Sequence, residues 1–284
     1  MRDLPVVTLG RSDIHVTRLI SGGNPLCANS HFSEEMNADM LEYFSPARVV
    51  EYLHRLQAAG INTIQARGDY HRVLAWLETF RREGGRLHWI AQTASEMHDV
   101  FQNIRILAAA GAVGIYHHGT QTDKFWREGR IDDVRDYLKC MRDAGVQVGL
   151  GTHIPDVIEY AEEKGWDIDF YMACFYNISR SPRESALVSS ATGDHSGETH
   201  EEFRTEDPPR MCETIRQTDK MCLAFKILGA SRACASQESV AEAFRFAFEN
   251  IKPKDAVVVG MFPKYADQIS LNVQHTRSAL GVTV

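Results

Sequence analysis

The stretch from Ala58 to Gln65, AAGINTIQ, carries the chain from the end of a helix into a short apolar strand. Its glycine supplies the left-handed conformation that ends a helix and turns the chain toward a sheet. The same junction recurs at Ala109–Ala112 (AAGA) and at Asp143–Val146 (DAGV). Repetition of this junction predicts β/α units that follow one another along the chain.

Apolar runs of strand length alternate with amphipathic helical segments over most of the chain. The later runs are continuously apolar, which is typical of parallel strands that helices cover on both faces. The expected strands are Arg18–Ser21, Ile61–Gln65, Leu87–Ala91, Ala112–His117, Gln147–Gly151, Phe170–Ala173, Met221–Lys226 and Ala256–Gly260. The expected helices include Pro46–Ala59, His98–Ala110, Ile131–Ala144, Pro155–Lys164, Ser239–Asn250 and Tyr265–Ser278. Eight such units predict an α/β fold, a (β/α)8 TIM barrel, in a single domain over residues 1–284.

Three segments depart from this alternation. Val6–Leu9 and Ile14–Val16 flank a polar turn and predict a β-hairpin before the first barrel strand. A polar loop is expected from after Gly23 to about Pro46, and Ile178–Pro209, after the sixth strand, lacks helical or strand periodicity. Long loops in compact domains are usually functional or disordered. Because both follow strands, we expect them at the carboxyl face, with the second covering the site; an insertion without function is the alternative.

Composition narrows the range of partners. The net charge of −7 argues against a general nucleic-acid or anionic-membrane surface, because both attract basic faces. No apolar run approaches the roughly 20 residues of a membrane span, and the amino terminus lacks a signal-peptide core. The six cysteines lack CxxC spacing, which is typical of reduced thiols in the cytoplasm. We expect a cytoplasmic protein that acts on a small molecule, with neither nucleic-acid nor membrane partners; the sequence does not indicate its oligomeric state.

Three segments resemble a known family. Leu9–Ser12, Ser21–Asn24 and Ile115–Gly119 (IYHHG) are similar to the opening hairpin, first strand and fourth strand of the aldo-keto reductases. In that family a tyrosine donates a proton to the substrate carbonyl while NAD(P)H delivers hydride, and a histidine orients the carbonyl. The resemblance implies that Tyr70 is the acid and that His118 orients the substrate.

The charged pair that acidifies the family's tyrosine is missing. Gln65 stands where the family has an aspartate, and Gln92 or Thr93 occupies the place of its lysine. A pair of amides forms hydrogen bonds but brings no positive charge to a phenol. Lys226, at the end of the seventh expected strand, is the candidate to replace the missing cation, and a solvated lysine is the alternative.

The resemblance also implies a dinucleotide, either NADP or NAD. The positions that would bind it are Gly22, Gly23, Asn24, Thr152, His153, Asn177, Phe225, Gly260, Met261, Gln268 and Asn272. Phe225 would stack on the nicotinamide, and a core phenylalanine is the alternative. Gln268 stands where a basic residue would clamp a 2′-phosphate, so the sequence favours neither NAD nor NADP. Gly229–Arg232 would either cradle a phosphate or form a turn.

A zinc site is an alternative use of the same strand ends. His118, His153 and Cys174 fall at the ends of the fourth, fifth and sixth strands, and imidazole and thiolate are ligands that zinc prefers. His117 and His118 cannot both face the barrel axis, because neighbouring strand residues point to opposite sides.

Three hypotheses for function remain open at this point. The leading one is a divergent NAD(P)-dependent oxidoreductase of aldo-keto reductase type, acting on a small carbonyl or sugar-like substrate. The second is a lyase, isomerase or hydrolase without nicotinamide chemistry, with or without a metal. The third is a non-catalytic barrel that binds a ligand.

Overall fold

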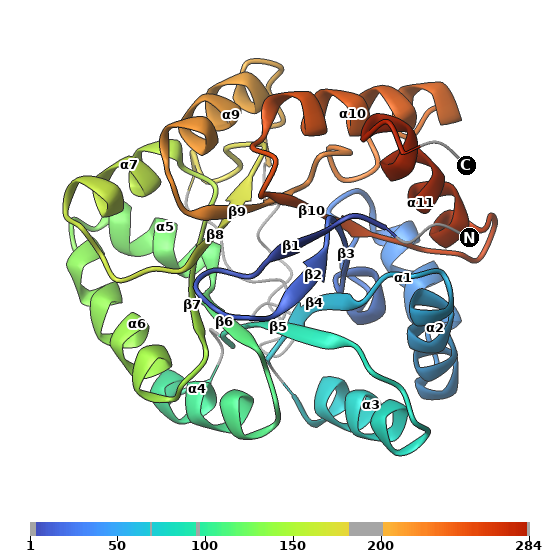
Figure 1. Ribbon diagram of the computed structural model, residues 1–284, viewed down its shortest axis with the longest axis horizontal. Helices are drawn as coiled ribbons and strands as arrows, with labels where there is room; N and C mark the ends of the chain where they lie inside the picture. The colour runs from blue at the N-terminus through green and yellow to red at the C-terminus, as the bar shows by residue number, and fades with distance from the viewer. Residues whose placement is uncertain (1–3, 69, 95–96, 182–200, 283–284) are drawn as a thin grey trace.

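The computed structural model describes residues 4–68, 70–94, 97–181 and 201–282, without the side chains of residues 70 and 71. Eight parallel strands close into a barrel in the order β10-β3-β4-β5-β6-β7-β8-β9, and Figure 1 shows them as a ring. Their bounds are β3 Leu19–Gly22, β4 Thr63–Arg67, β5 His88–Gln92, β6 Gly114–His117, β7 Gln147–Thr152, β8 Phe170–Cys174, β9 Met221–Phe225 and β10 Ala256–Gly260. The predicted (β/α)8 barrel is confirmed.

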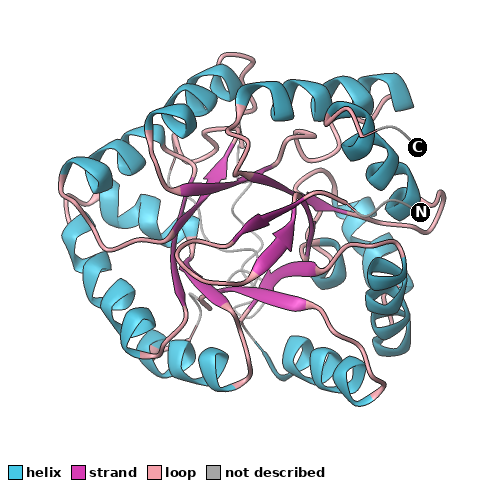
Figure 2. Cartoon of the chain, viewed as in Figure 1, coloured by secondary structure: helices cyan, strands magenta, loops and turns pink. Residues whose placement is uncertain are grey.

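Helices surround the ring of strands (Figure 2). Those that coincide with predicted helices are α2 Pro46–Ala58, α4 Val100–Ala109, η2 Ile131–Asp133 with α6 Val134–Asp143, α7 Pro155–Glu163, α10 Gln237–Asn250 and α11 Gln268–Ala279. Ser45 caps α2 as its sequence indicates, because its side chain accepts from the Arg48 N–H. Within the described part of the chain, no helix combines the length and apolar character needed to cross a bilayer.

Helix also forms outside the segments that the sequence analysis named as helices. The further helical segments are η1 Pro25–Cys27, α1 Glu34–Tyr43, α3 Tyr70–Arg82, α5 Gly119–Arg127 and α9 Asp207–Gln217. The prediction of loop up to Pro46 was wrong over α1, where Ser33 accepts from the Met36 N–H at 3.1 Å and two glutamates occupy the first turn. The loop after β8 ends at Glu206 instead of Pro209, because prolines are well suited to the first turn of a helix. Residues 182–200 of that loop lie outside the described residues.

The predicted hairpin is confirmed and lies across one end of the barrel. β1 Val6–Thr8 pairs antiparallel with β2 His15–Thr17, and Figure 1 shows both strands in front of the ring. Leu9, which directly follows β1, is fully buried among the side chains inside the barrel. Arg11 Nε donates to Asp169 Oδ1 at 2.5 Å. A buried carboxylate at the base of β8 therefore fastens the hairpin to the barrel.

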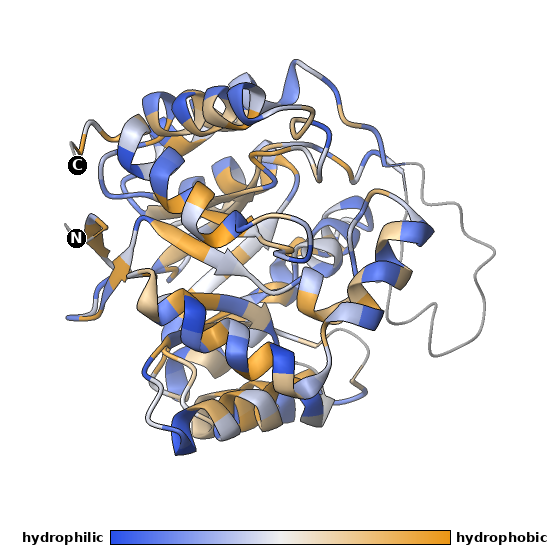
Figure 3. Cartoon of the chain, turned by 90° about the vertical axis from the view of Figure 1, so that its right-hand side faces the viewer, coloured by the Kyte–Doolittle hydropathy of each residue, from blue (hydrophilic) through white to orange (hydrophobic). Residues whose placement is uncertain are grey.

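Alternate side chains of the strands pack inside the barrel. This interior cluster includes Ile20, Ile90, Tyr116, Phe170, Met172, Leu223 and Val258. Two glycines of β7 make room for it: a Cβ at Gly149 would lie 2.4 Å from the Phe170 ring, and a Cβ at Gly151 would lie 2.9 Å from the Tyr116 ring. Figure 3 shows hydrophobic residues along the strands and polar residues on the outer helices.

Candidate active site

One inward-facing position on each strand, at or just beyond its carboxyl end, forms a ring that we call the mouth ring. The positions follow from the interior cluster, because residues two apart on a strand share a face. The mouth ring consists of Gly22, Arg67, Gln92, His118, His153, Cys174, Phe225 and Gly260. Sequence analysis had selected seven of these eight residues. It missed Arg67, although this residue lies two positions after Gln65, and the two-residue period of a strand predicts that it faces inward.

A neutral chain of hydrogen bonds lies just below the mouth ring. Gln65 Nε2 donates to Tyr116 Oη at 2.8 Å, and Tyr116 Oη donates to Gln92 Oε1 at 2.9 Å. Burial raises the pKa of Tyr116 well above its ordinary value, and the Arg67 charge opposes this only in part. The two glutamines that replace the family's charged pair are therefore joined through a protonated phenol. No motif or spacing in the sequence singled out Tyr116.

Arg67 brings a buried positive charge to the mouth. It is 5% exposed, and it lies opposite Gln92 in the β4–β5 register. None of the eight barrel strands, all within the described ranges, contains another Asp, Glu, Lys or Arg. Arg67 is therefore the one Asp, Glu, Lys or Arg residue of the eight strands, and it lies at the mouth.

Asp123 of α5 and His153, directly after β7, form a buried hydrogen-bonded pair. His153 Nδ1 lies 2.6 Å from Asp123 Oδ2, and the two residues are 4% and 0% exposed. Thr152 Oγ1 and Ser179 Oγ each donate to the same carboxylate at 2.5 Å. The His153 ring meets Phe225 edge-on, with 5.6 Å between ring centroids. His153 is therefore held rigidly in the mouth. Sequence analysis missed Asp123 because it did not predict α5.

The surroundings of Asp123 fix the protonation of the pair. Burial by itself raises the pKa of Asp123, but His153 and the two hydroxyl donors outweigh it and leave that pKa below its ordinary value. An ionised carboxylate can only accept, so the His153 proton that lies between the two residues is on Nδ1. Ser179 Oγ lies 3.4 Å from Nδ1, on the Asp123 side of the ring. A serine nucleophile would face Nε2, so Ser179 positions Asp123 instead.

The two adjacent histidines at the end of β6 lie in different surroundings. His117 Nδ1 lies 2.8 Å from Thr122 Oγ1, and its ring stacks on Tyr137 with 5.0 Å between centroids. His118 precedes the first residue of α5 at the mouth, and its backbone N–H donates to Thr93 Oγ1 at 3.0 Å. His117 therefore packs among the helices, and burial lowers its pKa to about 4.

The environment of His117 predicts an acid-sensitive stability. Its pKa is about 4 in the folded protein and about 6.5 in an unfolded chain, so the unfolded chain binds more protons between these values. The free energy of unfolding therefore rises with pH over this range, by roughly 3 kcal/mol in total. We expect urea denaturation to show this loss from pH 7 to pH 4, and His117→Gln to remove most of it. An equal loss in the variant would contradict the assignment.

The catalytic roles of Tyr70 and Lys226 remain predictions. Tyr70 is the first residue of α3, and its side chain lies outside the described residues. Lys226 follows β9 in a left-handed conformation with φ of 58°, and its carbonyl accepts from the Gly229 N–H at 2.8 Å. Phe225, and not Lys226, takes the inward position of β9.

The residues assigned to the nicotinamide use their polar groups within the protein. Thr152 and His153 both bond to Asp123. The Asn177 side-chain oxygen accepts from the Ser179 N–H at 3.2 Å. Of this set, Thr152 and His153 are buried, whereas Asn177 and Phe225 are partly exposed.

The residues assigned to the remainder of the dinucleotide are also engaged. Gln268 Oε1 accepts from the Phe262 N–H at 2.7 Å. Met261 is fully buried, and Asn272 is 5% exposed within α11. The Phe262–Gln268 hydrogen bond joins the segment after β10 to the first residue of α11.

The glycine-rich turn after β3 is closely packed. Gly22 pairs with Gly260 across β3 and β10, and a Cβ at Gly23 would lie 2.9 Å from Ala66. Asn24 precedes η1. These glycines allow neighbouring segments of the backbone to pack closely, because a Cβ would collide with them. The described residues therefore do not fit a dinucleotide at the positions that the resemblance implies.

The zinc alternative also lacks a site in the described residues. No three His, Cys, Asp or Glu side chains among them come together to hold a metal. His118, His153 and Cys174 share the mouth ring, but Asp123 holds the His153 ring by Nδ1 and His118 lies beyond its strand. The grouping of these three as zinc ligands therefore stays a prediction that the described residues do not support.

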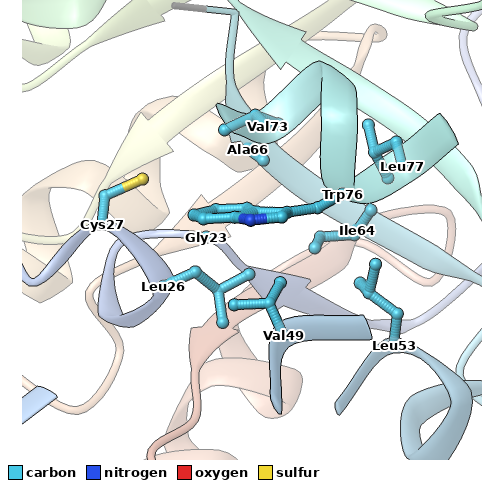
Figure 4. Close-up of a pocket in the computed structure, with 10 residues that line it drawn as sticks. All are labelled: Gly23, Leu26, Cys27, Val49, Leu53, Ile64, Ala66, Val73, Trp76 and Leu77. Carbon is cyan, nitrogen blue, oxygen red and sulfur yellow. The ribbon is translucent and has the colours of Figure 1, made fainter. Parts of the chain in front are cut away.

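A separate hollow lies outside the barrel wall, between β4, η1, α2 and α3. Its lining is apolar and includes Leu26, Val49, Ile64 and Trp76, with Cys27 at one edge. Figure 4 shows the Trp76 indole in the middle of these side chains. This lining offers little for acid–base chemistry, in contrast to the mouth ring.

Solved structures similar to this protein are (β/α)8 enzymes of several kinds. A putative aldo-keto reductase from Pseudomonas aeruginosa is 19% identical, with 98% of each chain covered and a TM-score of 0.60. A glycerol dehydrogenase from Gluconobacter oxydans is 10% identical, with 98% of this chain and 94% of that chain covered and a TM-score of 0.55. A truncated 3-deoxy-D-arabino-heptulosonate 7-phosphate synthase from Thermotoga maritima is 15% identical, with 99% and 95% covered and a TM-score of 0.54. No protein-family model and no curated protein matches the sequence. At these identities the similarity establishes the barrel fold, and the chemistry rests on the residues of the mouth.

Proposed function

We propose that this protein is an enzyme that moves a proton to or from a small hydroxyl- or carbonyl-bearing substrate in the mouth of the barrel. The observation that carries the proposal is the Asp123–His153 pair, which is buried, fixed in orientation and placed in the mouth ring. Carboxyl ends of the strands are where barrel enzymes hold their catalytic groups. A histidine oriented by a carboxylate is the commonest general acid–base arrangement.

The proposed step uses the two edges of one imidazole ring. His153 accepts a substrate proton at Nε2, and the imidazolium that forms is stabilised through Nδ1–H by the charge of Asp123. The same Nε2 then returns the proton to a neighbouring carbon or oxygen of the substrate. Thr152 and Ser179 keep the Asp123 carboxylate in place during both transfers.

Carbonyl reduction of aldo-keto reductase type with NAD(P)H is the second candidate. It is favoured by Phe225, an aromatic ring of the mouth in contact with His153, at the position where the resemblance implies nicotinamide stacking. The engaged residues described above count against it. In this candidate Tyr70, His118 and Lys226 retain the roles that the resemblance implies.

A proton-exchange assay separates the two candidates. The protein is incubated in D2O with a panel of small hydroxy-aldehydes, hydroxy-ketones and sugars, and ¹H NMR follows carbon-bound protons. The first candidate predicts exchange or isomerisation without any added dinucleotide. Turnover that appears only with NADH or NADPH, together with saturable dinucleotide binding that Phe225→Ala weakens, would overturn the first candidate and support the second.

A further inference from the structure

We infer that the mouth binds a small oxyanion, a carboxylate or a phosphate group of the substrate, through Arg67 and Gln92. This inference rests on the proposed function, because it places the substrate in the mouth ring beside His153. It adds the class of substrate, which the Asp123–His153 pair does not define.

Two hydrogen-bond donors stand side by side on β4 and β5. Arg67 and Gln92 are register partners on these neighbouring strands. Tyr116 donates to Gln92 Oε1, so the Gln92 amide group is turned with its oxygen toward the interior. Its Nε2 has no acceptor among the described residues, and the side chain is partly exposed. The amide therefore directs N–H groups toward the mouth, next to the guanidinium.

The guanidinium is suited to an oxyanion. It carries five N–H donors in a planar fork that matches carboxylate and phosphate oxygens, so it can hold a protein partner and a ligand anion together. At 5% exposure it is poorly screened by water, which strengthens its attraction for an anion. The Gln65–Tyr116–Gln92 chain adds no negative charge beside it.

The replacement of charged residues by glutamine fits the same role. Gln65 shares a strand face with Arg67, and Gln92 is its partner across the ladder. An aspartate at residue 65 would bring a competing carboxylate to the same strand face. The two amides instead keep the hydrogen bonds to Tyr116 without adding a negative charge beside Arg67.

Calorimetric titration with simple anions tests this inference. Inorganic phosphate and malonate are titrated into the intact protein, with neutral glycerol as the uncharged comparison. We expect binding of at least one anion and none of glycerol. Arg67→Met should weaken anion binding by about tenfold or more, since it removes charge-assisted hydrogen bonds. Tighter binding of phosphate indicates a phosphate ester as substrate, and tighter binding of malonate indicates a carboxylate.

Matched variants separate the anion site from folding and from the acid–base pair. Gln92→Glu keeps the side-chain shape and should also abolish anion binding, because it places a carboxylate beside Arg67. Arg135→Met makes the same chemical change on an exposed position of α6 and should bind as the wild type does. His153→Gln should retain anion binding even if it loses turnover. Anion binding therefore tests the Arg67 site independently of the acid–base role of His153. Absence of anion binding by the wild type, or equal binding by Arg67→Met, would overturn the inference.

Discussion

Replacement of His153 by glutamine is expected to lower kcat by about 10²- to 10⁴-fold on a substrate identified in the exchange assay, with little loss of stability. Glutamine can still donate a hydrogen bond to Asp123, but it cannot carry a proton between substrate atoms. Asp123→Asn should also lower kcat strongly, because an amide can donate to Nδ1 and so favours the wrong tautomer. Steady-state kinetics of both variants provides the measurement.

His117→Gln is the matched control for this result. It makes the same change on the preceding buried histidine, whose ring packs against Tyr137 and not in the mouth. Its kcat near neutral pH should stay within about threefold of the wild-type value, an expectation that follows from its lack of contact with the reacting atoms. Equal losses in His117→Gln and His153→Gln would indicate a general effect on folding and would remove the support for His153 as the proton carrier.

Loss of the Asp169 carboxylate is expected to cause the largest fall in stability. This side chain is fully buried, and it accepts from Arg11 Nε at 2.5 Å and from the Val148 N–H at 2.8 Å. Arg142 Nη1 lies 2.8 Å from its second oxygen. Asp169→Ala leaves these donors without their shared acceptor and should cost about 3–5 kcal/mol. Differential scanning calorimetry should show a fall in Tm of roughly 10 °C.

Asp167→Ala provides the control for the Asp169 variant. Asp167 contacts the same two arginines, but its side chain is 59% exposed. Exposed ion pairs contribute little because water and salt screen them, so this change should cost no more than about 1 kcal/mol. Similar falls in Tm for the two variants would show that burial at the base of the hairpin is not what fastens it to the barrel.

The barrel could be predicted because its signals are local and repeated. Gly60, Gly111 and Gly145 each adopt positive φ at the end of a helix, as the repeated junctions indicated. The apolar strand runs then determined the order of the elements. The helix α1 was missed because its polar composition is typical of a loop, although Ser33 followed by two glutamates is a recognisable helix start.

The site was predicted only in outline, because its decisive contacts join distant segments. Strand ends, together with the resemblance, indicated seven of the eight mouth-ring residues. The Asp123–His153 bond spans 30 residues, and the Gln65–Tyr116 bond spans 51, so neither follows from local spacing. Arg67 could have been found from the two-residue period after Gln65. The resemblance directed attention to Tyr70 and to missing charges, whereas the structure places a histidine–carboxylate pair in the mouth.

The state of the His153 ring tests the central claim most directly, without knowledge of the substrate. In protein with ¹⁵N-labelled histidine, two-dimensional ¹H–¹⁵N NMR distinguishes the two ring nitrogens, and His153→Gln identifies the signal. The structure predicts that Nδ1 of His153 carries a proton in the wild-type protein, and that Asp123→Asn removes this preference. A neutral His153 with its proton on Nε2 and a bare Nδ1 in the wild-type protein would contradict the account.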